Sequence, residues 1–388
     1  MMKRAGPIIA GAAAAGAVAA GAAQHTNVFN AVCPACMAEK RWTSTVDYAR
    51  LERELFTLGN GRPVRTAGDW TVRRQEIRQR ILGILGPFPN AVPLAPQVIE
   101  EHNADGMIRR RVSYQVEDGE RVSAWLLIPD ACDLSKRHPA ILCIHQTTDV
   151  GKDEPVGLAG DPNLDYARVL CRQHGYITLT PDLLTAGERV KAGMKPFFTD
   201  DFYARHPGRS MFGKNLWDNM KAVDYLQGLA FVDPGRIGCT GHSLGGNGTL
   251  YLAAFDERIQ AAVESCGGTQ LFQANYDFAL EYSRTHWYIY ASRLRPYFLK
   301  KTVPYDTHEL LALVAPRAYL QTGAFNDGVN PNPFDTVQTA ALTKKVFAFR
   351  GAGGNYDLFM HHGTHGYPAV AIEHGVAVFD RVLRETRE

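Results

Sequence analysis

The feature that most constrains the fold is an alternation of short apolar runs with longer amphipathic ones over residues 139–388. The apolar runs have the length of strands, and the amphipathic ones show helical spacing. Strands are expected at 139–146, 176–182, 236–243, 259–266, 317–325 and 346–351, and helices at 164–175, 213–229, 244–255 and 368–385. Strands that alternate with helices form a mostly parallel central sheet with helices on both faces. The sequence therefore predicts an α/β fold.

The chain before this alternation differs in pattern. Apolar residues recur at helical spacing over 69–85, and Gly86-Pro87 is typical of a helix end. Residues 106–129 alternate in strand fashion around Asp118-Gly119, which predicts a hairpin. We therefore expect a helix-rich N-terminal extension over 24–105 and one large domain over 106–388. Within that domain, residues 269–307 form an expected insertion that covers or lines a pocket.

Residues 1–23 have the layout of a secretory signal peptide. Lys3 and Arg4 precede an Ala/Gly-rich run that ends in an Ala-x-Ala-like stretch, and the pair is not a twin arginine. A disordered Ala/Gly tail is the alternative interpretation. Once this segment is removed, the mature protein is expected to be secreted or periplasmic, with no stable membrane anchor.

Charge and cysteine content exclude several classes of protein. The net charge of +2 gives no reason to expect a nucleic-acid partner. Seven cysteines are too few for a disulfide scaffold in 388 residues. Cys33 and Cys36 form a single CxxC pair, and no second pair completes a zinc site. The cysteines in apolar runs, Cys143, Cys171, Cys239 and Cys266, are expected to be core residues.

A reactive serine is indicated by RIGCTGHSLGGNGTLYLAAF, residues 236–255, in which glycines surround Ser243 between a strand and a helix. A serine at such a turn projects its hydroxyl above the sheet from a strained backbone, and glycines two residues away on each side prevent collisions. The following helix N-terminus offers free N–H groups to a developing oxyanion. The pattern predicts that Ser243 is a nucleophile, with a plain tight turn as the alternative.

The serine hydroxyl needs a base that is held by an acid. Both are expected after the serine in chain order, at the carboxyl ends of later strands. Asp327, just past the strand at 317–325, is the predicted acid. Asp335 on the same loop and Glu264 near the end of an earlier strand are the alternatives.

The base is sought among the histidines of FMHHGTHGYP, between the last expected strand and the last helix. His365, next to Gly366 and just before that helix, is the predicted base. His361 and His362 are the alternatives, and either could instead line the pocket.

Two backbone N–H groups are expected to bind the oxyanion. One belongs to Leu244, directly after the serine, and the other to Gln146 or Thr147, after the strand at 139–146. His145 is expected to orient this second loop rather than act as a base. Asp182, at another strand end, is expected to bind the loop or the substrate, or to serve the structure alone.

With these residues in view, the chain resembles the α/β-hydrolase superfamily, in the bacterial esterase branch near dienelactone hydrolases, acetyl xylan esterases and glucuronoyl esterases. Three stretches carry the resemblance: HQTTDVGKDEPVGLAG, GHSLGGNGTLYLAAFDERIQAAVESCGG and YDTHELLALVAPRAYLQTG. It covers residues 106–388 and implies a metal-independent Ser-Asp-His hydrolase that acts through an acyl-enzyme.

The chain departs from one of these groups at the serine. Glucuronoyl esterases carry an arginine directly after it, where this sequence has Leu244. They also commonly take their acid from an earlier strand, which is why Glu264 is kept as an alternative. The departure concerns the substrate and not the triad.

The function expected from the sequence is therefore a serine carboxylic-ester hydrolase, with no cofactor and no metal. Its expected substrate is a small-molecule or carbohydrate-linked ester, and the oligomeric state is not defined. A serine peptidase and a lactonase or dienelactone-type hydrolase are the enzymatic alternatives. A non-catalytic binding protein with the same fold is the alternative from another class.

Overall fold

The computed structural model describes residues 44–283 and 292–384, which belong to one compact unit, residues 42–388. The expected signal peptide and the Cys33/Cys36 pair lie outside the described residues. Within the described ranges no helix is both long enough and apolar enough to cross a membrane.

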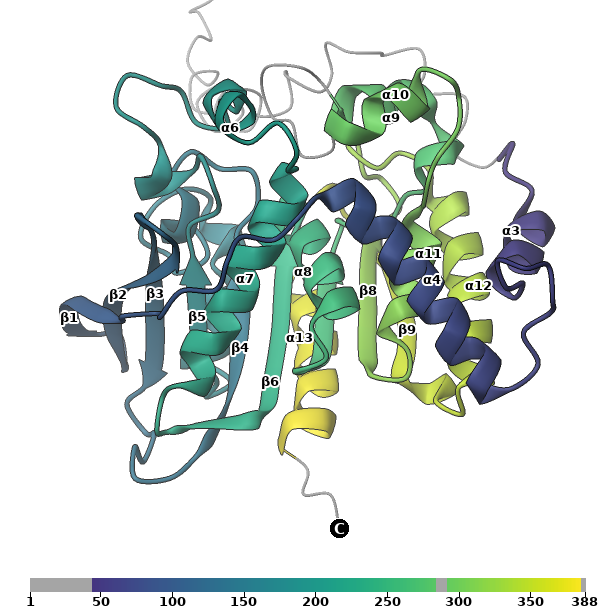
Figure 1. The fold of residues 1–388 in the computed structure, drawn as a ribbon. Helices are drawn as coiled ribbons and strands as arrows, with labels where there is room; N and C mark the ends of the chain where they lie inside the picture. Colours follow the sequence, from purple (N-terminus) through teal and green to yellow (C-terminus); the bar gives the residue numbers. More distant parts are fainter. Residues whose placement is uncertain (1–43, 284–291, 385–388) are drawn as a thin grey trace, which may run out of the picture. The chain divides into compact units, whose positions relative to one another are not determined.

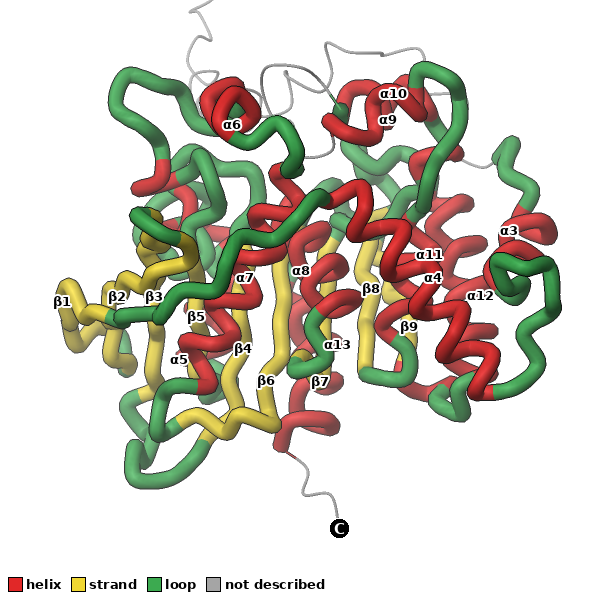
Figure 2. Tube along the Cα trace, viewed as in Figure 1, coloured by secondary structure: helices red, strands yellow, loops and turns green. Residues whose placement is uncertain are grey.

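A central sheet of nine strands organises the described chain, in the order β1-β2-β3-β5-β4-β6-β7-β8-β9 (Figures 1 and 2). Pairings among β1, β2, β3 and β5 are antiparallel, and all pairings from β5 through β4 to β9 are parallel. The bounds are β1 Gln97–Ala104, β2 Met107–Glu117, β3 Glu120–Pro129, β4 His138–Ile144, β5 Ile177–Pro181, β6 Val232–His242, β7 Ile259–Ser265, β8 Ala318–Ala324 and β9 Tyr356–His361. The mostly parallel α/β fold predicted from the sequence is confirmed.

Helices cover both faces of this sheet. On β4, Leu142 and Ile144 pack into one apolar cluster with α7 and α8, whereas Ile141 and Cys143 pack into a second cluster with α5 and α13. This alternation is what a strand buried on both faces requires. The helices are α3 Tyr48–Leu55, α4 Ala67–Leu85, α5 Tyr166–Arg172, α6 Asp200–Arg205, α7 Met211–Gln227, α8 Leu244–Phe255, α9 Tyr276–Tyr282, α10 Arg295–Phe298, α11 Thr307–Val314, α12 Pro333–Phe349 and α13 Ala369–Phe379.

The predicted hairpin and the long N-terminal helix are both present. The hairpin is β2–β3, with Gly119 at φ 69° in its turn. Helix α4 is capped at its start by a capping box at Thr66 and at its end by Gly86. Gly86 has a φ of 87°, which residues with a side chain rarely adopt. The sequence analysis missed β1, which lies within the expected extension and pairs with β2.

One predicted strand is wrong. Residues 346–351 were expected to form a strand, but Val346–Phe349 is the end of the 17-residue helix α12. The last strand is instead β9, which begins at Tyr356. A short apolar run does not distinguish a strand from a buried helical turn. Here the helix begins at Asn332, whose side chain accepts the N–H of Asp335, and it places Val346 and Phe347 in the core.

The carboxyl ends of the parallel strands meet at one edge of the sheet, where α6, α9 and α10 also lie (Figure 1). Ligands of open α/β sheets bind outside this edge. The predicted site residues follow β4, β6, β8 and β9 at the same edge, so the topology alone brings them together.

Candidate active site

The turn at Ser243 has the strained geometry expected of a nucleophile. Ser243 has φ 53°, and its N–H donates to the carbonyl of Ser265 on the neighbouring strand at 2.7 Å. A Cβ on Gly245 would collide with the carbonyl of Ile144, and one on Gly246 would lie 2.7 Å from the carbonyl of Ser265. The glycines are therefore needed because backbone approaches backbone on both sides of the serine.

The predicted acid and base lie together. His365 Nδ1 is 3.0 Å from Oδ1 and 2.9 Å from Oδ2 of Asp327. Asp327 follows β8 and is 2% exposed, and His365 lies on the loop between β9 and α13. The N–H groups of Val329 and Asn330 donate to Asp327 Oδ1 at 2.7 and 2.8 Å. The backbone thus fixes the orientation of the Asp327 carboxylate independently of His365.

The charge on Asp327 is set by these contacts. Burial alone would raise the pKa of Asp327, but the charge and hydrogen bond of His365 and the two backbone N–H groups lower that pKa below its usual range. An ionised carboxylate accepts Nδ1–H, so the other ring nitrogen, Nε2, is the one left for a substrate-side proton. The His365 ring centroid lies 4.7 Å from that of His242, which directly precedes Ser243. The acid–base pair is therefore beside the serine turn.

The alternative bases are placed differently. His361 is the last residue of β9, and its Nδ1 accepts the N–H of Gly363 at 3.2 Å. His362 is exposed, with its ring 5.5 Å from that of Phe325. Of the three histidines, His365 is the one that the structure brings within hydrogen-bond distance of Asp327.

The alternative acids are also used elsewhere. Glu264 is fully buried in β7 and accepts the N–H of Gly268, and burial raises the pKa of Glu264 to about 8. Asp335 accepts the hydroxyl of Tyr48 at 2.5 Å and the amide of Asn332 at 2.6 Å. Burial thus favours the neutral form of Glu264, and Asp335 holds α3 against the start of α12.

Cys266 is buried, as the sequence analysis expected, and it also lies beside the acid–base pair. Its Sγ and the ligand atoms of Asp327 and His365 all lie within 4.8 Å of one another. It has φ 53° and is buried, which raises the pKa of its thiol. A thiol, an imidazole and a carboxylate are also metal-type ligands, but here Asp327 and His365 already satisfy each other. Cys266 directly follows β7, the strand next to β6, and this position in the sequence could have predicted its place beside the site.

The two loops of the expected oxyanion hole lie at the same edge. Leu244 is the first residue of α8, where helical N–H groups have no intrahelical partner. Gln146 and Thr147 follow β4. His145 Nδ1 lies 2.6 Å from the carbonyl of Gln146, and its Nε2 accepts the N–H of Leu183 at 3.0 Å. Burial lowers the pKa of His145, so a neutral imidazole fixes this loop, as the sequence analysis expected.

Asp182 binds the loop that follows β4 and the segment that follows β5. It is 1% exposed, and its carboxylate accepts the N–H and the ammonium of Lys152 at 2.8 and 3.0 Å and the N–H of Glu188 at 3.0 Å. Asp182 thus binds the loop after β4, which is one of the roles expected from the sequence.

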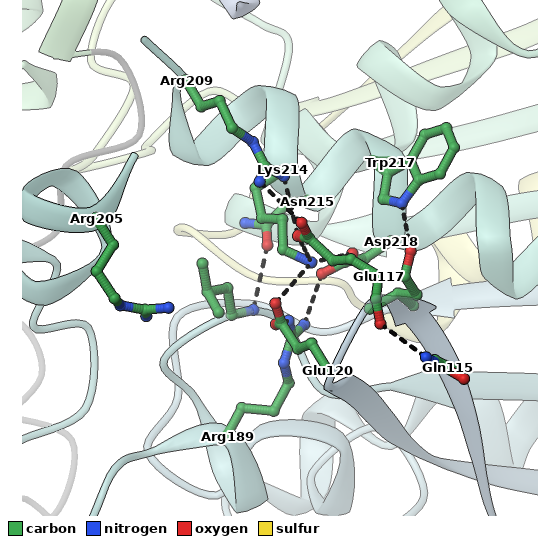
Figure 3. A network of polar contacts seen from close by, with 12 residues as sticks. Gln115, Glu117, Glu120, Arg189, Arg205, Arg209, Lys214, Asn215, Trp217 and Asp218 are labelled. Carbon is green, nitrogen blue, oxygen red and sulfur yellow. Dashed lines mark hydrogen bonds and ion pairs between the residues drawn. The ribbon is translucent and has the colours of Figure 1, made fainter. Parts of the chain in front are cut away.

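A buried ion-pair network fixes the beginning of α7 (Figure 3). The Lys214 ammonium lies 2.5 Å from Asp218 and 2.9 Å from Glu117, and Arg189 pairs with Asp218 at 2.8 Å and with Glu120. The network joins α7 to the β2–β3 hairpin and to the segment after β5.

The arginines of the expected insertion are engaged with the backbone. Arg293 donates to the carbonyl of Gly208 at 2.5 Å, and Arg295 donates to the carbonyls of Leu280 and Ser283 at 3.1 and 3.3 Å. Arg284 lies outside the described residues.

Comparison with known proteins agrees with the fold and with the resemblance. A family model described as "Glucuronyl esterase, fungi" matches residues 175–351. The putative hydrolase YtaP of Bacillus subtilis is 25% identical over 316 residues, 80% of this chain and 100% of that protein. The 4-O-methyl-glucuronoyl methylesterase of Phanerochaete carnosa is 23% identical over 68% of this chain, which spans 63% of that protein.

Solved structures show the same fold. The glucuronoyl esterase from Solibacter usitatus has a TM-score of 0.66 at 21% identity, over 84% of this chain and 96% of that one. A putative acetyl xylan esterase from Bacteroides fragilis has a TM-score of 0.59 at 20% identity, over 82% and 83%.

Proposed function

We propose that this chain, an α/β-hydrolase similar to the glucuronoyl esterases, is a serine carboxylic-ester hydrolase that acts on esters of carbohydrates. The observation that carries the proposal is the pair of buried Asp327 and half-buried His365 beside the strained Ser243 turn. The similarity to proteins named as carbohydrate esterases supports the substrate class.

The mechanism follows from this geometry. His365 Nε2 takes the proton of the Ser243 hydroxyl as the oxygen attacks the ester carbonyl, and the N–H of Leu244 and of Gln146 or Thr147 binds the oxyanion. The imidazolium, held by Asp327, returns the proton to the leaving alcohol as the ester C–O bond breaks. Water then attacks the acyl-enzyme by the same proton transfers and releases the acid. These steps need no cofactor.

Hydrolysis of p-nitrophenyl acetate by wild type and Ser243→Ala, with EDTA present, tests the proposal. We expect wild-type turnover to persist in EDTA and to fall by several orders of magnitude in Ser243→Ala. A fluorophosphonate should label wild type and the control Ser135→Ala, whose serine is an exposed loop residue, but not Ser243→Ala. If wild type neither turns over nor is labelled, Ser243 is no nucleophile and a binding protein is the better description.

A peptidase is the second candidate, because dipeptidyl-peptidase 5 of Porphyromonas endodontalis is 26% identical over 141 residues. This chain spans 18% of that protein, so the similarity concerns the hydrolase core alone. Dipeptidyl p-nitroanilides distinguish the two activities. Amide turnover that exceeds ester turnover would favour the peptidase.

We also propose that residues 1–23 direct export and are then removed. The support is their sequence layout, Lys3 and Arg4 before an Ala/Gly-rich run. The intact mass of protein recovered from the medium or periplasm of a bacterial host tests this. A full-length mass confined to the cytoplasm would contradict it.

A further inference from the structure

A small apolar cavity lies between the start of α7, the first half of α8 and the segment after β5. Its volume is about 10 Å³, close to the ~10–15 Å³ that one water molecule requires. A methyl group has similar size. The cavity is lined by Leu183, Phe212, Asn215, Leu216, Leu244, Gly248 and Tyr251.

This cavity adjoins one half of the proposed oxyanion hole and is linked to the other half through His145. Leu244 is one of the lining residues, and its N–H belongs to the oxyanion site proposed above. Leu183 also lines it, and the N–H of Leu183 is bound by His145, which fixes the loop of Gln146. A carbonyl carbon attached to Ser243 would thus have the cavity next to it.

The cavity lies on the side away from the base. His365 leads into α13, which packs on one face of the sheet, whereas α7 and α8 pack on the other. The leaving alcohol must lie near His365 to receive its proton. The group that stays on the serine then points away from His365, toward α7 and α8.

The lining offers nothing to a charged group. Asn215 is its polar member, and its Oδ1 accepts the N–H of Leu184 at 3.1 Å. Lys214, next in sequence, is 1% exposed and paired with Asp218 and Glu117. A carboxylate in the cavity would lose its hydration without a cation to replace it.

We propose that this cavity is the acyl pocket and that it selects a short, uncharged acyl group, acetyl above longer chains. The inference rests on the proposed esterase function and refines its substrate: the carbohydrate is then the alcohol part of the ester, and not the acid part as in a glucuronoyl ester. Leu216 and Phe212, two large apolar members of the lining on α7, set the length limit.

The test compares p-nitrophenyl acetate, butyrate and hexanoate in wild type, Leu216→Ala and Phe212→Leu. Wild-type kcat/KM should fall at least tenfold from acetate to hexanoate, since one methylene in a tight pocket alters kcat/KM by about 10–200-fold. Each variant should raise the hexanoate-to-acetate ratio about tenfold. Leu226→Ala, a buried leucine on the same helix outside the lining, is the matched control and should keep the wild-type ratio.

Sugar esters test the orientation. Wild type should deacetylate glucose pentaacetate at least tenfold faster than it hydrolyses methyl glucuronate, at equal concentration. A reversed preference, or a chain-length ratio that neither folded variant changes, overturns the acyl pocket while the esterase function stands. If wild type hydrolyses no ester at all, the proposed function fails and the pocket assignment fails with it. Melting curves of all variants establish that each is folded.

Discussion

At the residue scale, burial and hydrogen bonds shift the pKa values of two buried carboxyl groups in opposite directions. Asp327 and Glu264 are both buried, but Asp327 has an imidazole and two backbone N–H groups, whereas Glu264 accepts from backbone N–H groups without a cation beside it. The pKa of Asp327 is therefore lowered and that of Glu264 raised. Only the first is suited to hold a histidine that becomes positively charged.

Asp327→Asn should lower kcat by about 10⁴, the cost when the acid of a triad becomes an amide. Glu264→Gln should keep kcat within a few-fold of wild type. Steady-state kinetics on p-nitrophenyl acetate measures both. The reverse pattern would move the acid to Glu264.

Because of the raised pKa of Glu264, the free energy of unfolding should fall as the pH rises. Its pKa of about 8 in the folded chain lies above the ordinary 4.5. Between these values the folded state therefore keeps a proton that the unfolded state has lost, and each pKa unit corresponds to about 1.4 kcal/mol. Glu264→Gln should flatten the decline in the free energy of unfolding from pH 5 to 8.

Urea unfolding at several pH values measures this slope. Glu257→Gln, at a largely exposed carboxylate, is the control and should retain the wild-type slope. An unchanged slope in Glu264→Gln would mean that Glu264 is ionised in the folded protein.

At the scale of elements, the site depends on close backbone packing between β4, β6 and α8. Gly245 lies against the carbonyl of Ile144 with no room for a Cβ, whereas nothing lies within 4 Å of a Cβ on Gly354. Gly245→Ala should therefore lower both Tm and kcat, because α8 would have to move away from β4. Gly354→Ala should change neither. Thermal melting with the acetate assay measures both, and a wild-type Tm and kcat in Gly245→Ala would contradict the packing argument.

Helix α7 is held by charges rather than by apolar contacts alone. Lys214→Met leaves Glu117 and Asp218 with less compensation, and removal of one partner from a buried ion pair costs about 3–5 kcal/mol. Lys344→Met breaks an exposed pair with Asp357 and should cost less than about 1 kcal/mol. Urea unfolding compares the two. Equal small losses would mean that the network contributes little.

At the scale of the whole molecule, α3 and α4 pack onto the hydrolase core. Trp70, Ile77 and Ile81 on α4 are buried in the main apolar cluster, and Arg80 pairs with Glu309 on α11. A variant that begins at residue 87 should thus be insoluble or melt more than 10 °C lower. A variant that begins at residue 44 retains both helices and is the reference for this comparison. Equal Tm values would show that α3 and α4 are dispensable for the core.

Much of this architecture was predictable because its signals are local. Apolar periodicity found the parallel strands except β9, and glycine spacing indicated Ser243. The misplaced strand at 346–351 and the unforeseen proximity of Cys266 to His365 have a common cause. The elements that become neighbours decide both outcomes. They determine whether Val346 belongs to a helix or a strand, and which buried residues lie beside Cys266.

Ser243 and Cys266 leave adjacent strands with the same φ of 53°, and each N–H is bound by a carbonyl of the next strand, that of Ser265 or Thr322. The reacting edge is thus tied together laterally by the sheet itself. In mechanical terms, neither turn can shift alone, because the N–H of Ser243 is anchored to β7 and that of Cys266 to β8.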